Sequence, residues 1–373
     1  MKKTLTWVTV DYFVDCDFNP ELLKKILDLF KIHWIILLPY KNSRCSESDF
    51  KELNKLHDLK IEFLYSSFRQ RDPRRLLYYL DLFKRIKEIN ADIIYLNCVP
   101  DPYLMPFFWI FNKRKTIFCA HDGEVHAGFD FNLITKATFK LSYKFAKYVC
   151  TFSYSQERLF NKNFSKSKTF VIPLSLKTFG NCNVLKSENK IIFLSFGVIN
   201  YSKNIGLLID AACNVYERGY NNFKISINGN CSNWDLYKSR IRYPQLFECN
   251  IRPINNNEIA EIFQKAHYLV QPYRHVSQSG VMKVAFNYNL PVIASDFPGF
   301  SEEIKEGTNG FLFHSLDVQS LEKLMSKVID EHRTEYPLLL NKMAVHTKTF
   351  YAPNVIADRY LKMFDKVISS NVE

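Results

Sequence analysis

Short apolar runs alternate along the chain with longer segments in which apolar residues recur every three or four positions. The runs have the length and residue types of buried strands, and the longer segments have the period of amphipathic helices. Predicted strands form two series, at 4–10, 33–38, 61–65, 92–97, 115–120 and 147–152, and then at 190–197, 223–229, 267–271, 291–295 and 311–313. The clearest predicted helices are 74–88, 205–218, 256–265 and 317–332. Because continuous apolar strands separated by helices are typical of parallel sheets covered on both faces, the pattern predicts two doubly wound α/β domains.

A polar, Asn-rich segment between the two series predicts the domain boundary. The stretch SLKTFGNCNVLKSEN, residues 175–189, has the composition of a linker. We therefore expect a first domain over 1–175 and a second domain over 176–353. A last amphipathic run at 354–369 follows Pro353, a natural break between helices. This C-terminal helix, at about 354–373, is expected to pack back on the first domain.

The composition is that of a globular protein, with 373 residues of which 47% are apolar and 24% charged, and it excludes a disordered or fibrous chain. Nine Cys occur without any C-x-x-C pair, which indicates reduced thiols in a cytoplasmic protein. Asp11 interrupts the N-terminal apolar run, so that run is interpreted as a strand rather than a signal peptide. No apolar stretch approaches the roughly 18 residues of a membrane span.

The net charge of +12 is unevenly distributed. Residues 1–175 contain 28 Lys and Arg against 19 Asp and Glu, and the rest of the chain contains 22 against 19. The first half therefore carries most of the excess. A basic surface of this kind binds nucleic acid, anionic lipid or phosphorylated substrates, and charge alone does not choose among them.

The segment VSQSGVMKVAFNYNLPVIASDFPGFSEEIKEGTNGFLF, residues 276–313, is a candidate binding region. A helix is predicted from Ser279 to Tyr288 with Ser277 or Ser279 as its N-cap, and such a helix start holds a diphosphate well. The loop at 296–299 follows a predicted strand, at the edge where open α/β sheets bind ligands. Ser301 with two following acids predicts a further helix cap. The alternative is that all these features are ordinary capping and turn chemistry.

Several motifs, in this order, resemble those of retaining glycosyltransferases of family 4. The donor-side motifs are FLSFG with Lys203-Asn204 and LLIDAA, INGN, PYR, SQSGV, PVIASD, GFSEEI and EGTNGFL. In the first half, CAHD, TFSYS and VIPLS are similar to the family's His-bearing loop and its two domain-closing signatures. The resemblance covers most of residues 90–315. It implies the GT-B fold, with two Rossmann-like domains facing a central cleft.

The resemblance also implies which residues bind the donor, a nucleotide sugar with UDP or GDP as its nucleotide. These residues are Gly197, Lys203, Asn204, Gln278, Ser279, Gly280 and Glu302. The sequence departs from the family pattern at the two usual glutamates, because Val276 and Val284 occupy those positions and valine accepts no hydrogen bond. Val198 stands where the family has an arginine, and Asp11-Tyr12-Phe13 replaces a Gly-Gly turn.

The loop HDGEVHAG at 121–128 directly follows a predicted buried strand. His121, Asp122 and His126 are residue types that bind metals, but no further His or Cys ligand is evident, so we expect no metal. The preferred interpretation is an active-site loop in which His121 or Asp122 contacts the reacting sugar and the acceptor hydroxyl. The remaining alternative is a plain polar loop. For Glu302, a first-turn acid that favours the helix dipole is the alternative to a sugar contact.

Two segments combine aromatic and basic residues, YLMPFFWIFNKRK at 103–115 and RQRDPRRLLYYLDLFKRIK at 69–87. Each is either a core helix with a solvated basic end or an interfacial patch that meets anionic lipid. No nucleic-acid-binding pattern is present, so nucleic acid is not an expected partner.

Taken together, the motifs predict a retaining, metal-independent glycosyltransferase of cell-surface polysaccharide synthesis, such as lipopolysaccharide, O-antigen or capsule. It would act on a glycan or lipid-linked acceptor at the cytoplasmic face of the membrane. The alternatives are a catalytically weak glycosyltransferase-like partner protein and a nucleotide-sugar epimerase on the same fold.

Overall fold

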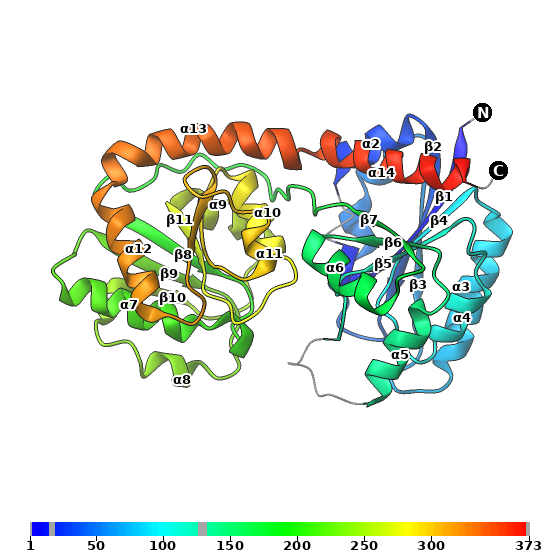
Figure 1. Cartoon of the computed structure of the whole chain (residues 1–373), viewed down its shortest axis with the longest axis horizontal. Helices are drawn as coiled ribbons and strands as arrows, with labels where there is room; N and C mark the ends of the chain where they lie inside the picture. The colour runs from blue at the N-terminus through cyan, green and yellow to red at the C-terminus, as the bar shows by residue number, and fades with distance from the viewer. Residues whose placement is uncertain (1, 15–18, 126–132, 371–373) are drawn as a thin grey trace. The chain divides into compact units, whose positions relative to one another are not determined.

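The structure is a computed structural model that describes residues 2–14, 19–125 and 133–370, in two compact units that each contain one parallel sheet (Figure 1). Unit 1 comprises Met1–Ser175 together with Pro353–Glu373, and unit 2 comprises Leu176–Ala352. The division therefore falls at the start of the polar segment, and the C-terminal helix belongs to unit 1.

Unit 1 contains a seven-stranded sheet in the order β3-β2-β1-β4-β5-β6-β7, with every neighbouring pair parallel. Its strands are β1 (Lys3–Val10), β2 (Phe30–Leu38), β3 (Leu59–Tyr65), β4 (Ile93–Asn97), β5 (Thr116–Ala120), β6 (Tyr148–Thr151) and β7 (Lys168–Val171). Successive residues of a strand enter different cores: Trp7 packs on one face and Val8 on the other. Burial on both faces explains why these strands appear in the sequence as unbroken apolar runs.

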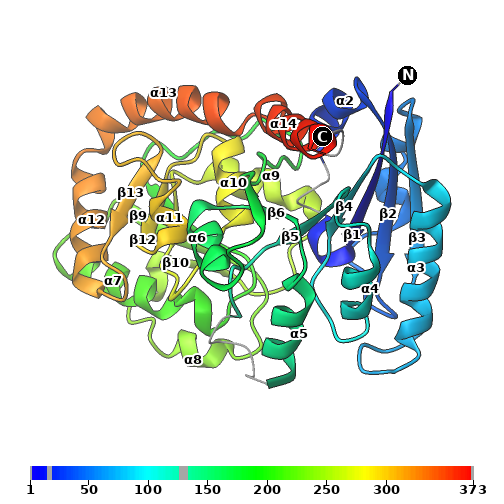
Figure 2. The same cartoon turned by 45° about the vertical axis from the view of Figure 1, so that its right-hand side comes forward.

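Helices cover both faces of this sheet (Figure 2). They are α2 (Pro20–Leu27), α3 (Arg75–Ile89), α4 (Met105–Ile110), α5 (Leu133–Tyr143), α6 (Tyr154–Asn163) and α14 (Pro353–Ser369). The first core contains residues of α2 and α14, and the second contains residues of α3, α4, α5 and α6. Tyr360 and Phe364 of α14 pack against Trp7 at ring distances of 5.2 and 6.3 Å, so the end of the chain completes the core begun by its first strand.

Unit 2 contains a six-stranded sheet in the order β10-β9-β8-β11-β12-β13, again with parallel neighbours. The strands are β8 (Ile191–Phe196), β9 (Phe223–Asn228), β10 (Phe247–Asn250), β11 (Tyr268–Gln271), β12 (Val292–Ser295) and β13 (Gly310–Phe313). The helices are α7 (Ile205–Glu217), α8 (Trp234–Lys238), α9 (Asn256–Lys265), α10 (Gly280–Asn287), α11 (Pro298–Ser301), α12 (Val318–Asp330) and α13 (His332–Tyr351). Residues of α7 and α12 lie in one core and residues of α9 and α10 lie in the other, and α13 contributes to both.

All eleven predicted strands are present, and the sequence pattern missed β7 and β10. Both are edge strands with half-buried or exposed residues, so neither produces an apolar run. The helix predicted within 103–115 is limited to α4, whose Phe107 and Phe108 are buried. Within 2–14, 19–125 and 133–370, no helix has both the length and the apolarity needed to cross a bilayer.

Candidate functional site

The donor-side candidates of unit 2 gather at the carboxyl ends of β8 and β11, where the strand order of the sheet reverses. Open α/β sheets bind ligands at such a switch point. Gly197 follows β8 with φ +112°, and Gly229 follows β9 with φ +149°. A Cβ on Gly229 would collide with the carbonyl oxygen of Gly197, so the two loops pass backbone against backbone. Glycine at 229 permits this close approach of the two loops.

Two cations at this edge are held by a crossed pair of cation–π contacts. The Lys203 Nζ atom lies 3.8 Å from the centre of the Tyr273 ring, and the Arg274 guanidinium carbon lies 4.4 Å from the centre of the Tyr201 ring. The Arg274 backbone N–H donates to the Ser202 carbonyl oxygen at 2.8 Å, which joins the loop after β11 to the short turn after β8. Because the rings fix both side chains, the two positive charges are held at the same part of the site.

A hydrogen-bond chain connects these cations to the start of α10. The Gln271 side-chain Nε2 donates to the Tyr273 hydroxyl at 2.8 Å and to Ser279 Oγ at 2.9 Å. Ser279 Oγ in turn accepts from the Met282 backbone N–H at 3.2 Å, so Ser279, and not Ser277, is the N-cap. The Ser279 hydroxyl is 4% exposed, and it serves to fix the helix start against Tyr273 and Lys203.

The first residue of α10, Gly280, is exposed and faces open space. A Cβ on Gly280 would meet no atom within 4 Å, whereas a Cβ on Gly197 would lie 3.8 Å from Val281 Cγ2 of the same helix. The helix start therefore lies beside the loop after β8. Its first N–H groups lack intrahelical partners because of helix geometry, and they carry the positive end of the helix dipole. Gln278, half-buried, directly precedes the N-cap.

Glu302 and the acid after it lie differently from the predicted helix start. Pro298 occupies the first turn of α11, and Glu302 is the C-cap of that helix, so the prediction of first-turn acids at 302 and 303 is wrong. Glu303 is buried and forms an ion pair with the buried Lys283 of α10. Lys283 Nζ also lies 3.7 Å from the centre of the Tyr351 ring. This acid is part of the interior of unit 2, whereas Glu302 lies at the end of a helix.

Helix α11 packs closely on the segment before α10. A Cβ on Gly299 would lie 3.0 Å from the Ser277 carbonyl oxygen, so the two backbones are in contact. The helix whose C-cap is Glu302 therefore packs on the residues just before Gln278. Asn204 lies on the other side of Lys203, with φ +49° at the N-cap of α7, and it is 7% exposed. Its left-handed backbone turns the chain from Lys203 into α7.

In unit 1, His121 directly follows β5 and lies at the carboxyl edge of the first sheet. Its ring lies between Phe13, at a centroid distance of 3.4 Å and nearly parallel, and Phe152, at 4.4 Å. Nε2 is 2.6 Å from Oδ1 of Asn97, the last residue of β4. Because that oxygen accepts, Nε2 carries the proton and Nδ1 is the unprotonated nitrogen. Burial lowers the pKa of His121 to about 3, against an opposing effect of Asp122, so the ring is neutral at pH 7.

Asp122 continues the same loop and is half-buried. The next residue, Gly123, donates its backbone N–H to Gln156 Oε1 of α6 at 2.7 Å, which fixes the loop after β5 to the helix after β6. The third candidate metal ligand, His126, lies outside the described residues. Within 2–14, 19–125 and 133–370, no three His, Cys, Asp or Glu side chains form a group that could hold a metal ion.

Three site residues were not assigned roles from the sequence. Arg274 and Tyr273 stand in the PYR motif directly after β11. Their position at the carboxyl end of a strand is the sequence signal by which they could have been found. Asn97 ends β4 and was interpreted only as a strand residue.

The Arg274 Nε atom is buried and has no hydrogen-bond partner among the described residues, so it lacks an acceptor.

Comparison with known proteins identifies a family for the second unit and a fold for the chain. Residues 182–343 match the family Glycosyl transferases group 1 and form a domain of that type. Over 342 residues the chain is 26% identical to a protein of Campylobacter jejuni subsp. jejuni serotype O:2, N,N'-diacetylbacillosaminyl-diphospho-undecaprenol alpha-1,3-N-acetylgalactosaminyltransferase. This match covers 85% of the chain and 89% of the relative.

Solved structures with similar folds include a glycosyltransferase from Rickettsia africae ESF-5, with a TM-score of 0.74, 14% identity and coverage of 98% of this chain and 99% of the other. Anabaena HepE in complex with UDP matches with a TM-score of 0.71, 15% identity and coverage of 98% and 100%. These similarities, with the two parallel sheets, confirm the predicted two-domain GT-B fold.

Proposed function

We propose that the chain is a glycosyltransferase that moves a sugar from a nucleotide-sugar donor, a UDP or GDP sugar, to a glycan or lipid-linked acceptor. The proposed pathway is synthesis of a cell-surface polysaccharide, at the cytoplasmic face of the membrane. Retention of configuration at the anomeric carbon and independence of metal are part of the proposal.

The observation that carries the proposal is the cluster of two cations and a helix start at the edge of unit 2. Lys203 is linked to the start of α10 through Tyr273, Gln271 and Ser279, and Arg274 is joined to the turn that contains Lys203 through Tyr201 and Ser202. A diphosphate has the charge and the acceptor oxygens to match it. Arg274 provides the second cation that the sequence lacks at Val198, and a phosphate oxygen would supply the acceptor that its Nε lacks.

The uncharged site in unit 1 suits an acceptor hydroxyl. During transfer, the bond from the anomeric carbon to the diphosphate breaks, and its electron pair leaves with the diphosphate. The acceptor oxygen forms the new bond, and its proton passes to an oxygen of the departing diphosphate. The imidazole of His121, neutral at pH 7 and fixed by its contact with Asn97, is the candidate for contact with a sugar hydroxyl. Asp122 is the adjacent candidate for contact with the reacting groups.

The comparisons favour transfer over the alternatives. The relative from Campylobacter jejuni is named as an N-acetylgalactosaminyltransferase acting on a diphospho-undecaprenol, and the HepE structure holds UDP. A similar fold also occurs in a protein named as a UDP-N-acetylglucosamine 2-epimerase, with a TM-score of 0.66 and 12% identity. The fold alone therefore does not separate transferase from epimerase, and the family match over 182–343 supports the transferase.

Thermal unfolding with a panel of nucleoside diphosphates tests the donor site. We expect UDP or GDP at 100 times its Kd to stabilise the protein by about 2.7 kcal/mol, because the ligand binds only the folded state. Lys203→Ala and Arg274→Ala should each remove most of this shift. Lys323→Ala, an exposed lysine of α12, is the matched control and should leave the shift unchanged.

Turnover is measured separately, with the nucleotide sugar identified by the panel and lipid-linked or oligosaccharide acceptors. Release of nucleoside diphosphate together with a glycosylated product supports a transferase, and the anomeric configuration of the product by NMR tests retention. Nucleotide binding with no product on any acceptor would favour the partner-protein alternative. Absence of any nucleotide-dependent shift would contradict the donor site itself.

A further inference from the structure

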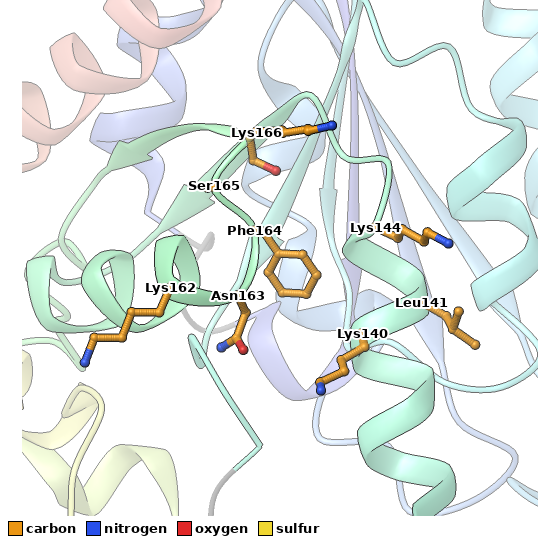
Figure 3. A pocket seen from close by; sticks show the side chains of 9 residues that line it. Lys140, Leu141, Lys144, Lys162, Asn163, Phe164, Ser165 and Lys166 are labelled. Atoms are coloured by element: carbon orange, nitrogen blue, oxygen red, sulfur yellow. The ribbon is translucent and has the colours of Figure 1, made fainter.

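A hollow of about 480 Å³ on the surface of unit 1 is lined by four lysines (Figure 3). Lys140 and Lys144 come from the end of α5, and Lys162 and Lys166 come from the end of α6 and the turn after it. Figure 3 shows the end of Lys140 near the ring of Phe164 and Lys144 and Lys166 on other sides of it, whereas the Lys162 side chain points away from the ring. Two helices that are separate in the sequence thus bring their basic ends to one place.

The lining of the hollow is basic and contains no acid. All four lysines are exposed, and none forms an ion pair with any residue in the described part of the chain. Attraction to a helix C-terminus accounts for Lys140 and Lys162, which lie in the last turns of α5 and α6. Lys144 directly follows α5 and is still close to that C-terminus, whereas Lys166 lies beyond the end of α6 and is not accounted for in this way. The hollow therefore has four positive charges with no acidic partner among the residues that the structure describes.

The hollow lies at the opposite edge of the sheet from His121. Lys144 shortly precedes β6, and Lys166 shortly precedes β7, so both are at the amino ends of these strands. His121 follows β5 and is at a carboxyl end. Because the sheet is parallel, these ends are opposite edges, and a ligand in the hollow is not the group that reacts beside His121.

Exposed apolar side chains adjoin the hollow. Trp109 Nε1 donates to the carbonyl oxygen of Leu141, which lines the hollow, at 2.6 Å. The Trp109 ring meets the Phe145 ring edge-on at 5.8 Å, and Lys144 Nζ lies 5.4 Å from the centre of that ring. Trp109, Ile110 and Phe145 are 39%, 59% and 43% exposed. Aromatic and aliphatic groups beside lysines are the composition of a surface that enters the headgroup layer of a bilayer.

The other basic segment of unit 1, at 69–87, differs because acids neutralise much of its charge. Arg74 pairs with Asp72, and Arg75 pairs with Asp101. A second hollow beside α3 contains Lys60, Lys84 and Arg85, but it also contains the acids Glu62, Asp81 and Glu88, and Arg85 pairs with the first two of them. Charge complementarity to an anionic surface is therefore concentrated at the end of α5 and α6.

We propose that the four-lysine hollow binds phosphate groups of lipids in an anionic bilayer, with Trp109, Ile110 and Phe145 entering the headgroup layer beside it. The surface comprising these seven residues is a docking site for the membrane and is separate from both candidate reaction sites. The inference goes beyond the proposed function, and it holds or fails without any measurement of glycosyl transfer.

Flotation of the full chain with vesicles tests the proposal, in vesicles of phosphatidylcholine alone and of phosphatidylcholine with 30% phosphatidylglycerol, without donor or acceptor. We expect the protein to bind the anionic vesicles and not the neutral ones. The variant Lys140→Gln/Lys144→Gln should lower the partition coefficient about 30-fold, since each lysine at an anionic surface contributes about a five-fold gain. Lys60→Gln/Lys84→Gln removes the same charge from the mixed hollow and should change it less than about two-fold.

Several outcomes would overturn the proposal. Equal binding to neutral and anionic vesicles would show that phosphate charge is not recognised. Equal losses of vesicle binding in the two double variants would show that binding depends only on the net charge of the protein and not on this hollow. If a single-stranded oligonucleotide bound more tightly than the vesicles and competed with them, the hollow would be a general polyanion site. Because all four substituted lysines are exposed, unchanged thermal unfolding is expected to verify that each variant is folded.

Discussion

Adding one methyl group at Gly280 should separate the stability of unit 2 from its binding of a donor. Among the described glycines, Gly280 alone combines a φ outside the left-handed region with open space around its Cβ position. Gly280→Ala therefore introduces no collision within the protein. Restricting the unfolded chain should raise the free energy of unfolding by about 0.4–1 kcal/mol. For a unit of this size, that corresponds to a rise in Tm of roughly 1–4 °C.

The same methyl group should weaken nucleotide binding. Phosphate oxygens held by the N–H groups at the helix start would lie about 2.9 Å from the nitrogens. The new Cβ is bonded to the same Cα as the first of these nitrogens, so it would crowd the phosphate oxygen there. Loss of one charge-assisted hydrogen bond costs about 1.5–3 kcal/mol, which is about 10- to 150-fold in Kd. Calorimetric titration with the nucleoside diphosphate and thermal unfolding of the free protein measure the two effects. Unchanged affinity in the stabilised variant would refute the placement of the diphosphate at α10.

Two further predictions concern ionisable side chains. Lys283→Met leaves the buried Glu303 carboxylate unpaired and should lower the free energy of unfolding by about 3–5 kcal/mol in urea titration. The double variant Lys283→Met/Glu303→Leu should recover most of that loss. A single variant as stable as the wild type would contradict a paired, buried carboxylate. His121 has a folded-state pKa of about 3, below its ordinary value of 6.5, so the unfolded chain takes up a proton there as pH falls. The contribution of the neutral His121 ring to stability is complete above pH 6.5 and decreases toward pH 3. Over this range, the His121→Gln variant should therefore lose less stability than the wild type. Parallel curves of Tm against pH for the two proteins would show that His121 is not held as a neutral ring.

The strands were predictable because burial on both faces leaves a continuous apolar run in the sequence. Strands β7 and β10 were missed because each lies at the edge of its sheet, where one side lacks a neighbouring strand and polar residues are tolerated. The helix at 301–303 was predicted wrongly because Ser301 with two acids has the composition of a helix start. Pro298 had already begun a short helix, and Pro at the first helical position was the signal to follow.

The candidate site was predictable where backbone chemistry defines it and less so where side chains from distant segments meet. Gly197 and the Ser279 cap could be located from turn and capping patterns. The position of Arg274 depends on the ring of Tyr201, which belongs to a different loop, and no local pattern records that contact. The burial of Glu303 likewise depends on Lys283, a partner on another helix. The spacing of residues along the chain predicts which helices, strands and turns contribute to a site, but tertiary packing determines which charged side chains are exposed.

The charge distribution of the chain becomes interpretable once each cation is placed in its unit. Unit 2 carries little net charge, yet Lys203 and Arg274 both lie at the carboxyl ends of its strands, where open α/β sheets bind ligands. Unit 1 carries most of the excess, but its ligand edge contains a neutral His121 between two phenyl rings. A diphosphate is therefore better matched to unit 2, and an uncharged hydroxyl is better matched to the site of unit 1. The excess lysines of unit 1 gather instead at the opposite edge of its sheet, which is why we assign them to a membrane surface rather than to the reacting groups.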